Sequence, residues 1–111
     1  MYNRSSLVKE ITDLKNSAII MLIDIRAFKE INDVYGGDFG NRVLVKFTKY
    51  LNQFFTNITQ TTLYRIGGDE FSVIFTNKSV NEVMQIGKNL EEAIRNQNFR
   101  ATCRFPQKQL I

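Results

Sequence analysis

The beginning of the chain passes from a helical spacing of apolar residues to a continuous apolar run. Apolar side chains recur at helical spacing near the start, which predicts an amphipathic helix; they are Leu7, Val8, Ile11 and Leu14. Residues 18–25 are then apolar except for Asp24, which predicts a strand that is buried on both faces. We therefore expect the carboxylate of Asp24 at the carboxyl end of a buried strand.

Two further helices are predicted before residue 60. The first is short, is marked by Phe28, Ile31 and Tyr35, and ends at Gly36-Gly37, because glycine adopts the left-handed conformation that helix ends often need. The second is longer and has an apolar stripe. That stripe consists of Val43, Leu44, Phe47, Leu51, Phe54, Phe55 and Ile58.

The second half of the chain predicts a hairpin, a helix and a last strand. Residues 61–66 and 71–75 have strand character and are joined by Gly67-Gly68, which predicts a two-residue turn. Ser79 and Glu82 have the spacing of a capping box and predict a helix start. The buried stripe of this helix consists of Val83, Ile86, Leu90 and Ile94. Residues 99–105 predict a strand that Pro106 ends.

The order of these elements predicts an α+β fold. After the first helix the chain has the order βαββαβ, which is typical of an antiparallel sheet with helices packed on one face. The length of 111 residues suits one domain with one core, and 43% hydrophobic and 23% charged residues are ordinary for a globular protein.

Composition narrows the possible chemistry. The chain has no histidine and a single cysteine, Cys103. This excludes a serine–histidine or cysteine–histidine nucleophile and a histidine-based zinc site. A metal ion would need oxygen ligands, which favours magnesium, manganese or calcium. One cysteine cannot form an internal disulfide, so a reducing cytoplasm is the expected location.

Charge and hydropathy exclude two classes of partner. The net charge is +4, but the basic residues are scattered with no run of five, so no nucleic-acid partner is predicted. The longest apolar run, residues 18–23, is too short to cross a membrane, so no membrane partner is predicted for this chain.

Three acidic residues, Asp24, Asp69 and Glu70, are predicted to gather at one edge of the sheet. They do so if the first strand lies beside the hairpin. Three neighbouring carboxylates repel one another, and a divalent cation turns that repulsion into attraction. The alternative is an ordinary solvated turn, which is the more common role of an acidic pair after a hairpin. Asp24 favours the metal site, because a carboxylate at the end of an apolar strand needs a partner.

Two long motifs stand out in the sequence. Residues 67–71 are Gly-Gly-Asp-Glu-Phe and follow Arg65, and residues 24–33 are followed by Gly36 and Gly40. They resemble the signature and the second motif of the GGDEF family of diguanylate cyclases, and residues 2–4 resemble the end of that family's opening motif. The resemblance runs from about residue 2 to about residue 103. It implies that residues 1–111 are a single, partial GGDEF domain with a nucleotide-cyclase or polymerase-palm-like fold and a ferredoxin-like core.

The resemblance implies an activity. Family members condense two GTP molecules into cyclic di-GMP and release pyrophosphate, in bacterial second-messenger signalling. Each domain holds one GTP, and two domains meet face to face as a homodimer. The expected cofactor is Mg²⁺ or Mn²⁺, with two ions per active site. A sensor domain usually regulates such modules, and none is present in this chain.

The resemblance also assigns roles to residues. Asp24, Asp69 and the Ile25 carbonyl would ligate the metal ions, while Glu70 would be a further ligand or help to deprotonate the attacking hydroxyl. Asp69 and Glu70 are thus the implied catalytic residues. Backbone amides near Ala27 and Phe28 would receive the terminal phosphates, and Asn32 would contact the guanine. The implied nucleotide-binding group is Ala27, Phe28, Lys29, Asn32, Asn41, Gly67 and Gly68.

Several positions depart from the family pattern. Arg26 and Gly37 replace an aspartate and a histidine, and Asn41 replaces an aspartate that accepts hydrogen bonds from guanine. Ile58 and Thr61 occupy the positions of the arginine and aspartate of the inhibitory product site, so no such site is predicted.

The family-like sequence fades after Cys103, which predicts a truncated or divergent carboxyl-terminal part. These departures leave two alternatives to a cyclase: a degenerate module that binds nucleotide or a protein partner without turnover, and a structural remnant.

Overall fold

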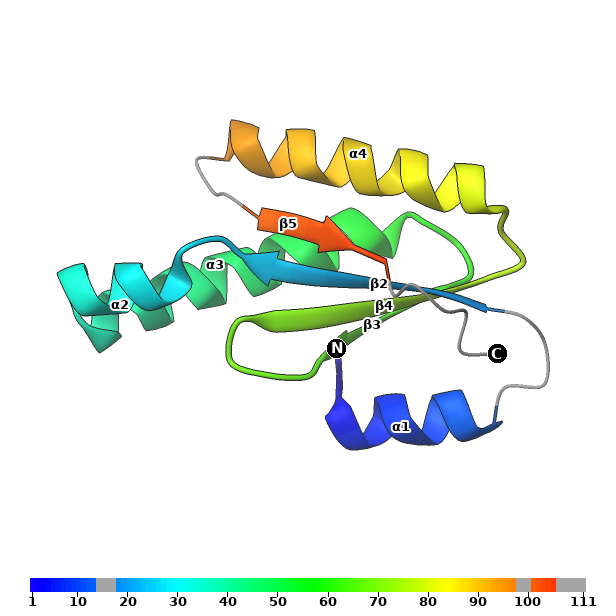
Figure 1. The fold of residues 1–111 in the computed structure, drawn as a ribbon, viewed down its shortest axis with the longest axis horizontal. Coiled ribbons are helices and arrows are strands. Elements are labelled where there is room, and N and C mark those ends of the chain that lie inside the picture. The colour runs from blue at the N-terminus through cyan, green and yellow to red at the C-terminus, as the bar shows by residue number, and fades with distance from the viewer. Residues whose placement is uncertain (14–17, 98–100, 106–111) are drawn as a thin grey trace.

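The computed structural model of the protein describes residues 1–13, 18–97 and 101–105 (Figure 1). The strands are β1 (Tyr2–Asn3), β2 (Ala18–Ile25), β3 (Thr61–Arg65), β4 (Glu70–Thr76) and β5 (Ala101–Arg104). The helices are α1 (Arg4–Asp13), α2 (Phe28–Tyr35), α3 (Gly37–Thr56) and α4 (Val80–Asn96). Leu14, Phe99 and Pro106, which belong to predicted elements, lie outside the described residues.

One sheet holds all five strands in the order β1-β3-β4-β2-β5. Strand β2 lies between β4 and β5 and is antiparallel to both, and β3 is antiparallel to β4. The predicted α+β fold with a βαββαβ order is therefore confirmed. The parallel pairing of β1 with β3 was not predicted, because two residues are too short a stretch to show a strand pattern.

Helices α3 and α4 cover one face of the sheet (Figure 1). Alternate residues of β2, namely Met21, Ile23 and Ile25, belong to the core on this face, where they join Phe47 of α3 and Leu90 of α4. The full set of buried residues in this core is Met21, Ile23, Ile25, Leu44, Phe47, Leu51, Phe55, Leu63, Phe71, Val73, Phe75, Val83, Leu90 and Ile94.

Helix α1 lies on the opposite face of the sheet (Figure 1). Its Leu7 is buried in a second, smaller cluster with Ala18, Ile20, Tyr64 and Ile74. Strand β2 is therefore buried on both faces, as its continuous apolar sequence predicts. The expectation of helices on one face holds for the βαββαβ unit, and α1 adds a cover on the other face.

The predicted glycine turn is wrong in its geometry. Residues 66–69 connect β3 to β4, and tight two-residue hairpin turns need positive φ angles. Among the described glycines, Gly36 alone has a positive φ, of 89°. The loop closes in another way, because the Glu70 carbonyl accepts hydrogen bonds from the amides of Ile66 and Gly67, at 3.0 and 3.2 Å. The connection is thus a wider loop that presents Asp69 ahead of β4.

Helix boundaries follow local signals. Gly36 separates α2 from α3, and α3 ends at Thr56, so Ile58 follows the helix rather than belonging to it. The capping box of α4 is confirmed: the Glu82 amide donates to Ser79 Oγ at 3.1 Å, and the Ser79 amide donates to Glu82 Oε1 at 3.0 Å. These bonds lower the pKa of the Glu82 carboxyl. No helix within the described ranges is long and apolar enough to cross a membrane.

Candidate functional site

The carboxyl end of β2 meets the start of β4 at one edge of the fold. Asp24 lies directly opposite Glu70 in the antiparallel pair of strands. The Ile25 amide donates a hydrogen bond to the Asp69 carbonyl at 3.4 Å. The predicted adjacency of Asp24, Asp69 and Glu70 is therefore confirmed at the level of the backbone.

The side chains at this edge do not yet converge on a common point. Asp24 forms an ion pair between its Oδ2 and Nη2 of Arg104, at the end of β5. Across the residues that the structure describes, no three acidic or sulfur side chains are grouped closely enough to hold a metal ion. A shared cation between residues 24, 69 and 70 thus stays a prediction.

The donor chemistry of this edge nevertheless fits a hard divalent cation. Directly opposed residues such as Asp24 and Glu70 share one face of the sheet, with Cβ atoms about 4.5–5.5 Å apart. Asp69 directly precedes Glu70 in the sequence, and its backbone carbonyl is hydrogen-bonded to the residue after Asp24. All the available ligands are oxygen atoms, which suits Mg²⁺ or Mn²⁺. The residues that would hold such an ion are Asp24, Asp69, Glu70 and the Ile25 carbonyl.

Arg65 stabilises the loop at Gly67-Gly68 through two hydrogen bonds, a role that was not predicted from the sequence. Its Nε donates to the Gly67 carbonyl at 3.2 Å, and its Nη2 donates to the Gly68 carbonyl at 3.0 Å. The guanidinium spans two successive carbonyls in this way because its donors form a rigid fork. The loop that carries Asp69 is held from inside the hairpin. The signal in the sequence was a basic residue two positions before the glycines.

The start of α2 offers backbone donors next to the acidic edge. Ala27 has a left-handed backbone with φ 57°, and no side chain caps the helix. The first amides of an uncapped helix lack intrahelical partners and attract anions. Phe28 packs against the main core and fixes the helix start, while Lys29 is exposed. This arrangement supports the predicted phosphate contacts, which stay a prediction.

Asn32 of α2 packs directly against Gly40 of α3. A Cβ atom built on Gly40 would overlap Asn32 Oδ1. Gly40 is buried, and Asn32 is half-buried. The absence of a side chain at position 40 therefore fixes where the Asn32 amide group can lie.

We expect Gly40→Ala to displace the Asn32 side chain and weaken GTP binding about tenfold, the effect of losing one hydrogen bond to a base. Isothermal titration of GTP measures this change. Gly37→Ala is the matched control, because a Cβ there meets no atom within 4 Å. Both substitutions place alanine in α3, where it favours a helix, and the unfolding midpoint of each variant shows whether its fold is kept. Equal GTP affinity in the two variants would contradict the positioning role of Gly40.

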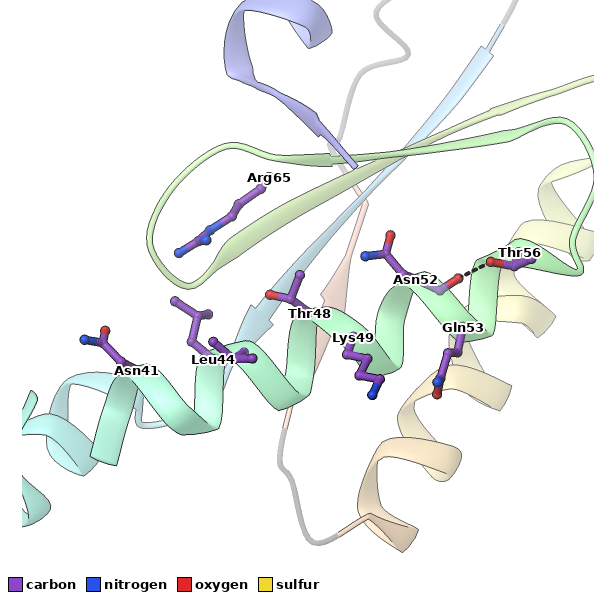
Figure 2. A pocket seen from close by; sticks show the side chains of 9 residues that line it. Asn41, Leu44, Thr48, Lys49, Asn52, Gln53, Thr56 and Arg65 are labelled. Carbon is purple, nitrogen blue, oxygen red and sulfur yellow. Dashed lines mark hydrogen bonds between the residues drawn. The ribbon is translucent and has the colours of Figure 1, made fainter. Parts of the chain in front are cut away.

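A groove of about 650 Å³ runs along α3 and faces Arg65 (Figure 2). Figure 2 shows Asn41 near the start of α3 and Arg65 on the strand that faces this helix. The lining residues are Asn41, Leu44, Val45, Thr48, Lys49, Asn52, Gln53, Thr56 and Arg65. Asn41 is exposed and available to a ligand. The base-contacting role of Asn41 stays a prediction that this groove supports.

Two other positions from the sequence analysis have local partners. The Thr61 hydroxyl donates to the Ile58 carbonyl at 2.8 Å, so these residues close the turn before β3. The absence of a product site there stays a prediction.

Burial raises the pKa of the Cys103 thiol to about 12, with a smaller contribution from Glu91. Cys103 is therefore a packing residue rather than a nucleophile.

The family profile for the GGDEF domain of diguanylate cyclases matches residues 1–109. The chain therefore belongs to the GGDEF family. The matched stretch continues to residue 109, so the family resemblance extends beyond Cys103, where the sequence analysis ended it.

Solved GGDEF domains have the same fold. The GGDEF domain of PA1120 (YfiN or TpbB) from Pseudomonas aeruginosa superposes with a TM-score of 0.75 at 22% identity, covering 91% of this chain and 72% of that one. The GGDEF domain of DgcB from Caulobacter crescentus, solved in complex with c-di-GMP, gives a TM-score of 0.78 at 19% identity and covers 97% and 75%. At these identities the likeness shows the fold alone.

The curated relatives are larger proteins without an assigned activity. An uncharacterized membrane protein of Staphylococcus haemolyticus is 30% identical over 105 residues, which are 94% of this chain and 28% of the relative. An uncharacterized membrane protein of Staphylococcus aureus is 32% identical over 95 residues, or 86% of this chain and 25% of the relative. The chain thus spans about a quarter of the length of these relatives. Its predicted cytoplasmic location stays a prediction.

Proposed function

We propose that this GGDEF domain is a diguanylate cyclase module that condenses two GTP molecules into cyclic di-GMP with release of pyrophosphate. The observation that carries the proposal is the pairing of Asp24 with Glu70, together with the hydrogen bond from Ile25 to Asp69. These contacts bring the acidic residues of two separate motifs to one edge of the sheet. A solvated turn alone would not require these two motifs to lie side by side.

The residues around this edge would divide the work of phosphoryl transfer. Asp24, Asp69 and the Ile25 carbonyl would hold Mg²⁺ or Mn²⁺, expected as two ions, which neutralises charge on the phosphoryl oxygens when bound. Glu70 would complete the ligand set or accept the proton of the attacking 3′-hydroxyl. The Gly67-Gly68 loop, without side chains, would let the nucleotide approach the backbone.

The nucleotide would extend from the start of α2 toward α3. The uncapped amides at Ala27 and Phe28 would receive the terminal phosphates, with Lys29 adding positive charge nearby. Asn32 and Asn41 would contact the base from α2 and from the groove.

Because each domain would hold one GTP, the reaction requires a second copy of the domain, and we propose a homodimer. The structural neighbour DgcB was solved in complex with c-di-GMP, which supports cyclic di-GMP as the proposed product.

Incubation of the protein with GTP and Mg²⁺ or Mn²⁺, followed by chromatography of the products, tests the proposal. We expect cyclic di-GMP and pyrophosphate, with a rate that rises more than linearly with protein concentration because two domains must meet. No product at high protein concentration would rule the cyclase out.

A second candidate is a degenerate module that binds nucleotide or a protein partner without turnover. Asn41 favours it, as does the engagement of Asp24 by Arg104. Among the structural neighbours, the diguanylate cyclase SiaD of Pseudomonas aeruginosa was solved with its activator SiaC, which supports a protein partner as one alternative. Calorimetry with GTP, GDP and cyclic di-GMP separates this candidate from an inert scaffold, and the product assay separates it from the cyclase, because the candidate predicts binding without product.

We expect Asn41→Asp to raise the preference for GTP over ATP about tenfold. An asparagine has one acceptor oxygen, and its amide donor opposes the donors on the guanine edge, whereas a carboxylate accepts from both. The cost of one mismatched donor is about 1–3 kcal/mol. The ratio of the two dissociation constants measures the effect. Asn52→Asp adds the same charge elsewhere along the groove and should leave the ratio unchanged. Comparable GTP turnover by wild type and Asn41→Asp would refute the base contact.

We propose that the domain works in the cytoplasm, where GTP is available and where an unpaired cysteine stays reduced. The curated relatives are named membrane proteins, so regulatory input could reach the domain through segments outside this chain. A sensor domain of that kind would set when two domains meet.

A further inference from the structure

The acidic edge has a built-in counter-ion. Asp24 and Glu70 stand opposite each other on one face of the sheet, where like charges destabilise the strand pair. The guanidinium of Arg104 binds Asp24 Oδ2 and offsets that repulsion. Within the described ranges this is the one ion pair between side chains.

The position of Arg104 follows from the strand register. Arg104 pairs with Leu22, two residues from Asp24, and therefore lies on the same face of the sheet as Asp24. An arginine side chain is long enough to span this diagonal. The exposed fractions of the two side chains are 57% for Arg104 and 27% for Asp24, so the pair is accessible to solvent and to ions.

We propose that Arg104 competes with the divalent cation for Asp24, so that metal binding must displace the guanidinium. This inference rests on the proposed function, which places the metal at Asp24, Asp69 and Glu70. One carboxylate oxygen does not serve both cations at full strength, and each relieves the same repulsion between Asp24 and Glu70. Binding of one therefore weakens binding of the other by an equal factor. Arg104, at the end of β5, would therefore be bound to Asp24 only while the metal site is empty.

Titration of the nucleotide-free protein with Mn²⁺, followed by the electron paramagnetic resonance signal of free Mn²⁺, tests this competition. We expect Arg104→Gln to bind Mn²⁺ about two- to fivefold more tightly, which is the range for a solvent-accessible ion pair. Asp24→Asn should lose most of the binding. Lys78→Gln removes one positive charge beyond Thr76, at the opposite end of the β2–β4 pair, and should match wild type.

The reciprocal measurement is the thermal unfolding midpoint with and without Mn²⁺. The ion should raise the midpoint more in Arg104→Gln than in wild type, so a variant with altered basal stability is still informative. Equal or weaker Mn²⁺ binding by Arg104→Gln, with binding still lost in Asp24→Asn, would overturn the competition and leave the metal site standing. Absence of Mn²⁺ binding in wild type and in Arg104→Gln would overturn the metal site itself, and the competition with it.

Discussion

Replacing Glu70 with glutamine should reduce cyclic di-GMP formation about a hundred- to a thousandfold, the usual effect of removing one electrostatic contact from an active site. The carboxylate is the group expected to hold the metal or take the proton, and glutamine keeps its shape without its charge. The backbone carbonyl of Glu70, which closes the hairpin loop, is unchanged by this substitution. The rate of product formation from GTP and Mn²⁺ measures the effect.

Glu92→Gln is the matched control, because Glu92 is exposed on α4 and loses the same charge. It should retain the wild-type rate, and the unfolding midpoints of both variants should stay close to that of wild type. Product formation by Glu70→Gln at the wild-type rate would show that the carboxylate has no part in the reaction.

Replacing Phe47 with alanine should lower the free energy of unfolding by about 3–5 kcal/mol. Phe47 and Phe71 are fully buried, and their ring centroids lie 5.6 Å apart between α3 and the sheet. The substitution leaves a cavity in the core and removes this ring contact. Small domains are stable by only about 5–15 kcal/mol, so the loss is a large share of the total. Urea unfolding measures it.

Val45→Ala is the control on the same helix, because Val45 is 67% exposed and should change the stability by less than about 0.5 kcal/mol. Phe71 directly follows Glu70 in β4, so the cavity opens beside the strand that carries Glu70. A loss of less than about 1 kcal/mol in Phe47→Ala would show that the core collapses onto the vacated space.

The sequence was most informative where one local pattern decides the structure. Residues 18–25 form a strand with the predicted bounds, since an apolar run of that length has few alternatives in a mixed fold. Ser79 and Glu82 began α4 as expected, because the capping box is made by neighbours in the chain. The adjacency of Asp24 to the hairpin also followed, once the βαββαβ order had indicated which strands would pair.

The features that escaped prediction depend on distant or weak signals. The ion pair of Asp24 joins residues that are 80 positions apart, and no periodicity links them. The hairpin loop was misjudged because a pair of glycines permits a tight turn without requiring one. Arg65 belongs to a sequence motif, but its hydrogen bonds to the Gly67 and Gly68 carbonyls depend on the three-dimensional path of the loop. The left-handed backbone of Ala27 has no signal in the sequence, since alanine rarely adopts it.

Helix α2 has no fully buried residue and packs against α3. Asn32 therefore stands on a lightly anchored segment, whereas the acidic edge belongs to the central strands of the sheet. In the proposed function, one contact to the base would therefore come from this helix, while the proposed metal ligands lie on and beside the central strands of the sheet. Under that proposal, substitutions on α2 or at the start of α3 would retune which nucleotide is preferred while the carboxylates keep their spacing. Asn41 is a change of this kind, because it lies at the start of α3 and outside the strands that carry the carboxylates.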